Sequence, residues 1–303
     1  MPILLTGGHG FLGRHLISAL SKAGHDVEAP SRAELDLSDR RAVQQFFKAG
    51  AFEACIHAAA TGGGIGWMKA HPETALLGNL LANTHVLEAA ADKGVYLVGV
   101  SSACVYPRDA IQPMEETQIW EGAPEPSNGP YGQAKRLMLV QGAAAAAERG
   151  ADCAFVVPTN LYGPGDHFAP DRSHIVAALV RRFEEARVQA QPEVLCWGSG
   201  QATRDLLFVR DAAEAILCAL QQRPGPEPIN LGTGLEYSTA VIAEAIAEAT
   251  GYKGRIQWDR SRPDGMPRKV LHTGRAQERL GWRAKTDLAT GLRETVEWFR
   301  RSG

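Results

Sequence analysis

Cysteine is scarce in this chain of 303 residues: there are five, widely spaced, and no two of them form a CxxC pair. This pattern argues against a disulfide framework and against a structural zinc site. The nine histidines show no HExxH or other clustered metal spacing, so we expect no metal centre. A reduced, cytoplasmic setting is the corresponding expectation.

Long apolar runs and an excess of one charge are also missing. No apolar stretch approaches the roughly 20 residues that span a bilayer. Residues 1–7 lack a basic leading region, so we expect neither a membrane span nor a signal peptide. The formal net charge is −2, which gives no indication of a nucleic-acid or membrane partner. Any anionic ligand must then be held by a few placed arginines or lysines.

Short apolar runs alternate with helical patterns through the first half of the chain. The runs are nearly continuous, as in strands that are buried on both faces. Strand–helix alternation at this spacing predicts βαβ units. The sequence therefore predicts an α/β fold, namely a Rossmann-type, doubly wound parallel sheet with a smaller C-terminal α/β substrate lobe. The expected strands and helices are 3–5, 10–23, a strand ending near 29, 40–48, 54–57, 72–93, 96–100, 131–149 and 153–157.

The pattern changes after residue 158, where a loop rich in proline and glycine begins. The pieces beyond it are too few for an independent second sheet, so we expect a lobe over the carboxyl edge of the sheet, where such folds bind ligands. They are helices near 173–190, 211–220, 239–250 and 287–300 and a strand near 194–197. The expected division is a dinucleotide-binding domain at 1–160, with returning segments near 203–232, and an interleaved substrate-binding lobe at 161–303.

A glycine cluster, Thr6-Gly7-Gly8-His9-Gly10-Phe11-Leu12-Gly13, follows the first expected strand. Gly7, Gly10 and Gly13 permit a tight turn, close approach of a pyrophosphate, and packing of the next helix on the sheet. A βα turn without a ligand would show a similar pattern, but a position at the start of a βαβ series favours dinucleotide binding.

The end of the second strand is where such folds distinguish NAD from NADP, usually with an acidic residue for NAD. The stretch from Ala29 to Arg32 has no carboxylate, and Arg32 suits a 2′-phosphate, although it could equally be a solvated surface residue. We therefore expect NADP(H). Further residues expected along the cofactor are Phe11, Leu12, Asp36, Leu37, Ala58, Ala59 and Ala60.

Tyr131 and Lys135 stand four residues apart, on one face of an expected helix. A phenol titrates near 10, too high for proton exchange at neutral pH. A neighbouring ammonium and a positive nicotinamide would lower that value. Ser102, just after the fourth strand, is suited to hydrogen-bond a substrate carbonyl beside the tyrosine.

With these residues in place, the sequence resembles the GDP-L-fucose synthase branch of the extended short-chain dehydrogenase/reductase family along essentially the whole chain. The segments that carry the resemblance are 102–107, 125–131, 158–164, 173–174, 197–200, 204–205 and 263–269. The resemblance implies NADPH-dependent 3,5-epimerisation and 4-keto reduction of a GDP-4-keto-6-deoxy sugar.

A ketone at C4 acidifies the neighbouring C–H bonds, so one group can remove a proton while another returns it on the opposite face. The resemblance places these roles on Cys104 and His174, whose residue types titrate near neutrality. Ser102 and Tyr131 would stabilise the enolate, and Tyr131 would then protonate the C4 oxygen. Taken alone, Cys104 could be a small buried hydrophobe and His174 a polar residue at a helix start.

The remaining residues carried over by the resemblance bind ligands. Substrate binding falls on Ser102, Cys104, Asn160, Arg182, Trp197, Arg204 and Lys269. Cofactor binding adds Tyr131, Lys135, Pro158, Asn160, Leu161 and His174. Trp197 could stack on a nucleobase or be an ordinary core residue, and Arg204 could form a structural ion pair. The resemblance also implies a homodimer, formed through the helices at 72–93 and 131–149.

Several positions depart from the family pattern. His9 stands where the branch often has an arginine for the cofactor phosphate, and Arg32 is one arginine where two are common. Residues 62–69, His167 and His272 also differ. A relative acting on a GDP-heptose or another 4-ketosugar, or performing only one half-reaction, therefore stays open. So do an NAD-retaining 4-epimerase and a redox-sensing regulator without turnover.

Overall fold

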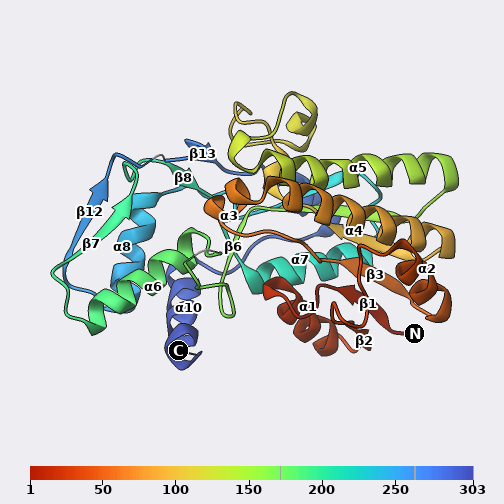
Figure 1. The fold of residues 1–303 in the computed structure, drawn as a ribbon, viewed down its shortest axis with the longest axis horizontal. Coiled ribbons are helices and arrows are strands. Elements are labelled where there is room, and N and C mark those ends of the chain that lie inside the picture. The colour runs from red at the N-terminus through yellow and green to blue at the C-terminus, as the bar shows by residue number, and fades with distance from the viewer. Residues whose placement is uncertain (171, 263, 303) are drawn as a thin grey trace.

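The computed structural model describes residues 1–170, 172–262 and 264–302, and its centre is a six-stranded parallel sheet (Figure 1). In spatial order its strands are β10 (Pro228–Leu231), β5 (Cys153–Pro158), β4 (Tyr96–Val100), β3 (Ala54–His57), β1 (Ile3–Thr6) and β2 (Val27–Glu28). Each neighbouring pair is parallel. This order, which reverses direction between β1 and β3, is that of a doubly wound dinucleotide fold, and it confirms the predicted fold class.

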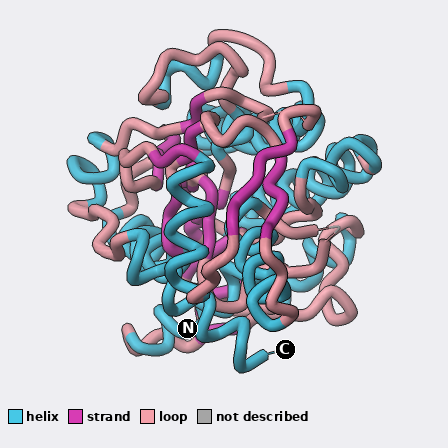
Figure 2. The backbone as a smooth tube through the Cα atoms, turned by 90° about the vertical axis from the view of Figure 1, so that its left-hand side faces the viewer, coloured by secondary structure: helices cyan, strands magenta, loops and turns pink. Residues whose placement is uncertain are grey.

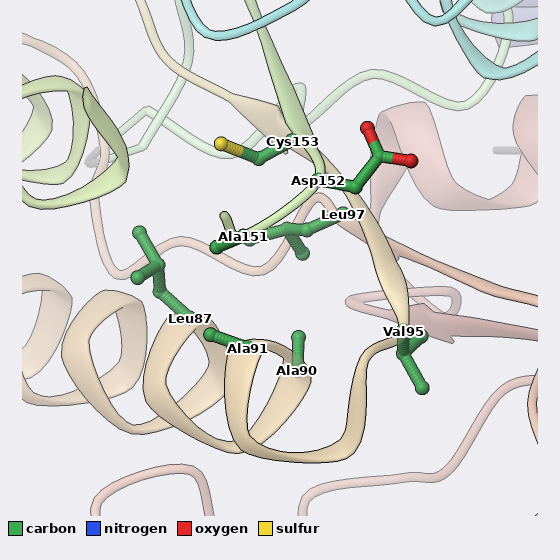
Figure 3. A pocket seen from close by; sticks show the side chains of 8 residues that line it. All are labelled: Leu87, Ala90, Ala91, Val95, Leu97, Ala151, Asp152 and Cys153. Atoms are coloured by element: carbon green, nitrogen blue, oxygen red, sulfur yellow. The ribbon is translucent and has the colours of Figure 1, made fainter. Parts of the chain in front are cut away.

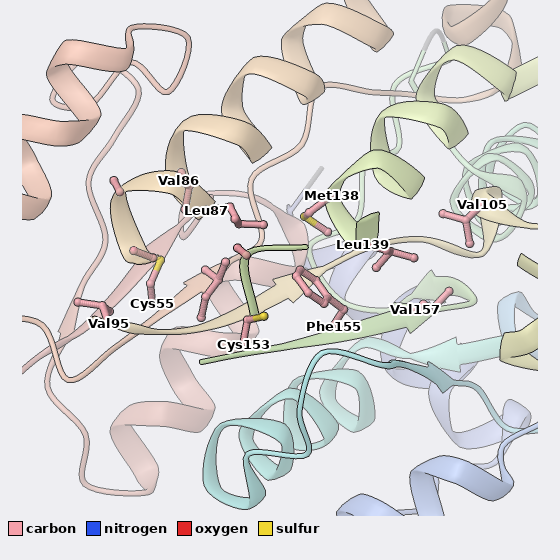
Figure 4. Close-up of a cluster of buried hydrophobic side chains, with 14 of the residues drawn as sticks. Cys55, Val86, Leu87, Val95, Val105, Met138, Leu139, Cys153, Phe155 and Val157 are labelled. Atoms are coloured by element: carbon pink, nitrogen blue, oxygen red, sulfur yellow. The ribbon is translucent and has the colours of Figure 1, made fainter. Parts of the chain in front are cut away.

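Helices cover both faces of this sheet. On one face lie α2 (Arg40–Ala49), α4 (Pro72–Lys93) and α5 (Gly129–Arg149), and on the other lie α1 (Phe11–Lys22), α7 (Val209–Gln222) and α9 (Gly274–Leu280). Figure 4 shows the first face, where Met138 and Leu139 of α5 and Val86 of α4 point onto the strands. Because both faces are covered, β1, β3, β4 and β5 are buried at every position, which explains their continuous apolar runs.

One gap in this packing lies between the C-terminal end of α4 and strands β4 and β5 (Figure 3). Its volume of about 10 Å³ is that of a packing defect and far below that of a ligand site. The residues lining it are Leu87, Ala90, Ala91, Val95, Leu97, Ala151, Asp152 and Cys153. Asp152 forms an ion pair with Arg223 at 2.8 Å.

The second lobe packs around its own hydrophobic core. Its helices are α6 (Ile175–Val188), α8 (Thr239–Thr250) and α10 (Leu288–Ser302). Three small sheets accompany them. They pair β7 (Glu193–Trp197) with β12 (Arg255–Asp259), β8 (Thr203–Arg204) with β11 (Tyr237–Ser238) and β13 (Arg268–Lys269), and β6 (Asn160–Tyr162) with β9 (Leu206–Phe208). In Figure 1 this lobe lies to the left of the central sheet, and Figure 2 shows the same backbone after a quarter turn.

Three 3₁₀ helices and one short α-helix complete the described elements. They are η1 (Ala103–Val105), η2 (Glu116–Trp120), η3 (Pro126–Asn128) and α3 (Ile65–Ala70). In the described part of the chain no helix is both long and apolar enough to cross a membrane. Among the same residues, no group of three or more histidine, cysteine, aspartate or glutamate side chains could hold a metal ion.

Asn230, on edge strand β10, fastens the excursion between β4 and α5 to the sheet. Its side chain accepts a hydrogen bond from the Tyr106 hydroxyl at 2.7 Å and donates to the carbonyls of Met114 and His272. Its backbone N–H donates to the buried carboxylate of Glu116. This fully buried side chain therefore holds three separate segments together.

We expect Asn230→Ala to lower the free energy of unfolding by about 3 kcal/mol, because it leaves the Tyr106 hydroxyl and the His272 carbonyl without partners and removes one of the two hydrogen bonds that the Met114 carbonyl accepts. Urea denaturation followed by circular dichroism measures this change. Gln222→Ala, on the last turn of α7, is the control and should change the stability by less than about 0.5 kcal/mol. A similar loss in both variants would contradict the role given to Asn230.

Candidate active site

The candidate site lies along the carboxyl edge of the central sheet, where the strand ends place their side chains together. Strand β1 leads into the glycine turn, β3 into the alanines at 58–60, and β4 into Ser101 and Ser102. Strand β5 ends at Pro158 and leads through Thr159 to Asn160. Residues expected from the sequence to meet a dinucleotide and a substrate thus share one edge of the sheet.

The glycine turn fits a dinucleotide. Gly7 has a φ of +77°, and a Cβ there would lie 2.6 Å from the backbone nitrogen of Ala59. A Cβ at Gly13 would collide with the carbonyl of Gly7, so α1 packs directly on the turn. Helix α1 begins after Gly10 with no side chain capping its first amides. These amides, at the positive end of a 12-residue helix, suit a diphosphate.

The turn after β2 holds the carboxylate of Glu34, in addition to that of Glu28 at the end of the strand. Glu34 lies beyond the strand but turns back, and its Oε2 accepts a hydrogen bond of 2.7 Å from the Ser31 N–H. Arg32 is exposed, and Asp36 accepts hydrogen bonds from the N–H and the hydroxyl of Ser38.

Lys135 and Tyr131 lie together on the first turns of α5. The Lys135 ammonium is buried, donates to the Val100 carbonyl at 2.9 Å, and lies 5.9 Å from the centre of the Tyr131 ring. Burial lowers the pKa of Lys135 to about 8. His57, behind this pair, bonds to Thr6 and Asn83, and burial together with the Lys135 charge lowers its pKa to about 3.

In the protein alone the pKa of Tyr131 is raised, and its expected lowering by Lys135 together with a positive nicotinamide stays a prediction. Burial of the phenol raises the pKa of Tyr131, the nearby thiol of Cys104 adds to the rise, and a hydrogen bond with Ser102 opposes it. The ammonium of Lys135 faces the Val100 carbonyl, so its charge is partly offset by that dipole. A lowered value would require further positive charge beside the phenol.

Cys104 has a hydrogen-bond donor and a cation beside its sulfur. Ser102 caps η1, its hydroxyl accepting from the Cys104 N–H at 3.2 Å. The amide nitrogen of Asn128 donates to Sγ at 3.1 Å, and the Lys269 ammonium lies 3.9 Å from it. These contacts orient Sγ and place a cation beside it, which are features of the surroundings of reactive cysteines. Cys104 is half-buried, unlike Cys55, Cys153 and Cys196, which are buried in the core.

His174 stands directly before α6, on the side of the site facing Lys269. Burial of the ring among neighbouring atoms lowers the pKa of His174, and the positive charges of Lys269 and His167 add to this, although part of the residue stays exposed to solvent. The charge of Lys269 thus acts on His174 as well as on Cys104.

Residues 62–70, which depart from the family pattern, lie over the tyrosine. The N–H of Gly64 donates to the carbonyl of Arg172, two residues before His174, at 3.2 Å. A Cβ at Gly62 would lie 2.9 Å from the Met68 side chain and 3.8 Å from the Tyr131 ring. This segment, which includes α3, therefore borders the space in front of Tyr131.

Arg204 connects the catalytic residues with the outer part of the lobe. It is the register partner of Lys269 in the β8–β13 pair. Its guanidinium donates to the carbonyls of Thr203, Met266 and Asp264. Among residues 1–170, 172–262 and 264–302 it forms no ion pair. Pro263, part of the 263–269 motif, lies outside the described residues.

Trp197, at the end of β7, is 62% exposed, which excludes the role of a core residue. The guanidinium carbons of Arg182 and Arg262 lie 5.8 and 5.1 Å from the centre of its ring. Ser199, two residues after Trp197, donates two hydrogen bonds to the carboxylate of Asp264, from its N–H and from its hydroxyl. The predicted nucleotide-binding residues therefore adjoin one another in space.

Three further residues contact this site although the sequence assigned them no role. Asn128 belongs to a segment that carried the resemblance, yet its contact with Cys104 depends on η3. Asp205, fully buried, accepts hydrogen bonds from Thr233 and Gly234, and its carbonyl accepts one from the Asn160 side chain at 2.9 Å. Arg262 reaches Trp197 from another strand end.

Comparison with known proteins identifies relatives along the whole chain. GDP-L-fucose synthase of Escherichia coli is 37% identical over 309 residues, covering 98% of this chain and 96% of the relative. Probable GDP-L-fucose synthase 1 of Oryza sativa is 36% identical over 300 residues, covering 98% and 91%. The resemblance inferred from the motifs is thus confirmed.

Solved structures agree on the fold. A GDP-L-fucose synthetase of Naegleria fowleri bound to NADP superposes with a TM-score of 0.87 at 28% identity, covering 99% of this chain and 94% of that one. A GDP-6-OMe-4-keto-L-xylo-heptose reductase of C. jejuni has a TM-score of 0.93 at 24% identity, covering 100% and 98%, and shows the fold alone. Residues 3–232 match the family model described as the NAD dependent epimerase/dehydratase family. The chain belongs to this family.

Proposed function

We propose that this protein is an NADPH-dependent 3,5-epimerase and 4-reductase acting on a GDP-4-keto-6-deoxy sugar. The observation that carries the proposal is the environment of Cys104, a half-buried thiol beside Asn128 and Lys269 in the same site as the Tyr131–Lys135 pair. Relatives named GDP-L-fucose synthase, 35–37% identical over nearly the whole chain, support it.

The epimerisation follows from carbanion chemistry next to a ketone. Cys104, as a thiolate, removes a proton from a carbon beside C4, and His174 supplies one from the other face; the same pair acts at C3 and at C5. The enolate oxygen at C4 is stabilised by the hydroxyls of Ser102 and Tyr131. Lys269 lies 3.9 Å from Sγ, where its ammonium faces the sulfur that takes up the proton.

The reduction uses the same C4 oxygen. NADPH, when bound, supplies the hydride. Tyr131 delivers its phenolic proton to the C4 oxygen, and Lys135, held by the Val100 carbonyl, keeps the tyrosine in position. The glycine turn at 7–13, Arg32 and the strand-end residues Pro158, Asn160 and Leu161 would hold the cofactor.

We assign the substrate's nucleotide to the C-terminal lobe. Arg182, Arg204 and Lys269 offset the diphosphate charge, and Trp197 presents an exposed indole face to the base. Under this proposal residues 1–160, with 203–232 returning to the sheet, bind the cofactor, and residues 161–303 bind the GDP-sugar. The five free cysteines suit the reducing cytoplasm in which we place the enzyme.

The test is turnover of GDP-4-keto-6-deoxymannose in D₂O, with NADPH oxidation followed by absorbance and deuterium at C3 and C5 followed by NMR. Consumption of NADPH with both carbons labelled is the expected result. Labelling without NADPH loss would indicate an epimerase alone, and NADPH loss without labelling a reductase alone. Absence of any reaction would contradict the proposal and direct the search to GDP-heptoses.

A homodimer accompanies the proposed function. Helices α4 and α5 lie side by side (Figure 1) and expose four large apolar side chains, Leu77, Leu81, Leu137 and Val140, each 39–47% exposed. Leu77 and Leu81 are one helical turn apart, and so are Leu137 and Val140, so each pair lies along one side of its helix. A second copy of this face would cover them as a four-helix contact.

We expect Val140→Glu to convert the dimer to a monomer, because it places a charge in an apolar interface at a cost of several kcal/mol for the two symmetric copies. Size-exclusion chromatography with light scattering measures the mass. Val188→Glu, at the exposed end of α6, should leave the dimer intact. A wild-type protein that elutes as a monomer would contradict the proposed interface.

A further inference from the structure

A chain of buried hydrogen bonds runs behind the candidate site, from the glycine turn to α5. Thr6, the last residue of β1, contacts His57, the last residue of β3, with 2.7 Å between the hydroxyl oxygen and Nδ1. The other ring nitrogen, Nε2, lies 3.0 Å from Oδ1 of Asn83 on α4. Nδ2 of Asn83 lies 3.2 Å from the Ala134 carbonyl on α5. All four residues are at most 1% exposed, so solvent does not compete for these bonds.

The last link of this chain fixes the direction of the others. A carbonyl oxygen only accepts, so the amide nitrogen of Asn83 donates to Ala134 and the amide oxygen faces the ring of His57. Nε2 of His57 must then carry the proton, and Nδ1 accepts from the Thr6 hydroxyl. One tautomer of His57 therefore satisfies all of these groups, and every donor points from the glycine turn toward α5.

His57 stays neutral within this chain. Burial lowers its pKa to about 3, the charge of Lys135 adds to this, and the hydrogen bond with Asn83 opposes it. A histidine that holds no second proton near neutral pH does not act as a general acid there. What His57 can supply is a fixed distance and direction between the groups on its two sides.

The two ends of the chain lie in the two halves of the proposed reductase site. Thr6 directly precedes Gly7, the first glycine of the turn that suits a diphosphate. Ala134 directly precedes Lys135, whose ammonium lies 5.9 Å from the centre of the Tyr131 ring. A path of three hydrogen-bonded side chains thus joins the turn for the cofactor to the helix that carries the tyrosine–lysine pair.

We propose that His57 is a positioning residue for the reduction, which couples the glycine turn to the start of α5. With the ring in place, the turn that receives the cofactor and the Tyr131–Lys135 pair are positioned together, so that both face the same carbonyl group of the substrate. A displacement of about 1 Å at a reacting centre can cost about 100-fold in rate. The inference rests on the reduction proposed above, and its alternative is a purely structural role of the ring.

Substitutions of His57 separate the two roles. His57→Leu removes both links and should lower kcat for ketone reduction about tenfold, with KM for the ketosugar unchanged. His57→Asn, whose amide oxygen replaces only Nδ1, should behave likewise. His57→Gln, whose amide nitrogen can take the place of Nε2, should restore kcat to within about threefold of wild type.

The matched control is Tyr96→Phe, on the opposite face of the sheet. It removes another buried hydrogen bond, from the Tyr96 hydroxyl to the Ala219 carbonyl at 2.8 Å. Urea denaturation should show a lower midpoint for this variant and for His57→Leu, but only His57→Leu should lose turnover. A His57→Leu enzyme with kcat within about twofold of wild type would overturn the inference.

Two measurements without turnover follow the chain itself. Nitrogen-15 NMR of the histidine rings should show His57, assigned by its absence in His57→Gln, with its proton on Nε2 from pH 6.0 to 8.5. Binding of NADPH, followed by its fluorescence, should weaken about threefold in Thr6→Val and in Asn83→Leu. The double variant should bind no more weakly than either single variant, because each substitution breaks the same chain.

The outcomes separate this inference from the proposed function. Additive effects of Thr6→Val and Asn83→Leu, or a proton on Nδ1 of His57, would overturn the coupling and leave the proposed function standing. If the wild-type protein binds NADPH but does not reduce the ketosugar, the proposed function fails, and the binding and NMR measurements still decide the role of His57. Equal NADPH binding by all variants would overturn that role in either case.

Discussion

Tyr131→Phe is expected to lower kcat for ketone reduction about 1000-fold with little change in KM. The phenylalanine keeps the ring and its packing but removes the only proton that Tyr131 can give to the C4 oxygen. Loss of a positioned general acid costs about 10²- to 10⁴-fold in rate. Initial rates of NADPH oxidation, measured over a range of ketosugar concentrations, separate kcat from KM.

The control is Tyr237→Phe, which removes a hydroxyl from half-buried β11 and should leave kcat within about twofold of wild type. A Tyr131→Phe enzyme that reduces the ketone at more than a tenth of the wild-type rate would contradict the role of proton donor. Burial raises the pKa of Tyr131, so the phenol holds its proton at neutral pH, as a donor must. Its return to the protonated state after each turnover then needs no unusual proton source.

Lys135 can act on Tyr131 in two ways, by holding the start of α5 in position and by its positive charge. Burial lowers its pKa to about 8, so its charge is lost as the pH rises through that value. The hydrogen bond to Val100 at 2.9 Å fixes the ammonium between β4 and α5. In the protein without ligands Lys135 therefore serves mainly to position the start of α5, and its electrostatic effect on the phenol depends on what is bound beside it.

The central sheet was predictable because its signals are local. Strands at 54–57 and 96–100 and the helix at 72–93 were predicted to the residue. Continuous apolar runs mark the strands, and Pro72 and Gly94 mark the ends of the helix. Strand β10 was missed because it begins with proline and includes the polar Asn230, so no continuous apolar run marks it. The two-residue strands β8, β11 and β13 exist only through their partners, which no local pattern encodes.

In the candidate site, too, local signals could be predicted and contacts between distant segments could not. The spacing of Tyr131 and Lys135 and the place of Ser102 after a strand could be interpreted from the sequence. The partners of Cys104 could not: Asn128 is 24 residues away in the chain and Lys269 is 165. Contacts made across long loops are fixed by packing, and a single sequence does not show them.

Cys104→Ser is expected to lower deuterium incorporation at C3 and C5 at least 100-fold while reduction of the ketone is retained within about fivefold. A serine hydroxyl is a far weaker acid than a thiol and cannot be held as the anion by Asn128 and Lys269. The Tyr131–Lys135 pair is untouched by the substitution. The two half-reactions should therefore separate in this variant, as NMR in D₂O and NADPH oxidation would show.

The product provides a second measure of the same prediction. If the C4 ketone is reduced before C3 and C5 have been inverted, the alcohol formed keeps the substrate's configuration at both carbons, and NMR coupling constants distinguish it from the wild-type product. Cys218→Ser, half-buried on α7, should give the wild-type product at the wild-type rate. Full labelling and inversion in Cys104→Ser would exclude this thiol as the base and leave His174 or a bound water to remove the proton.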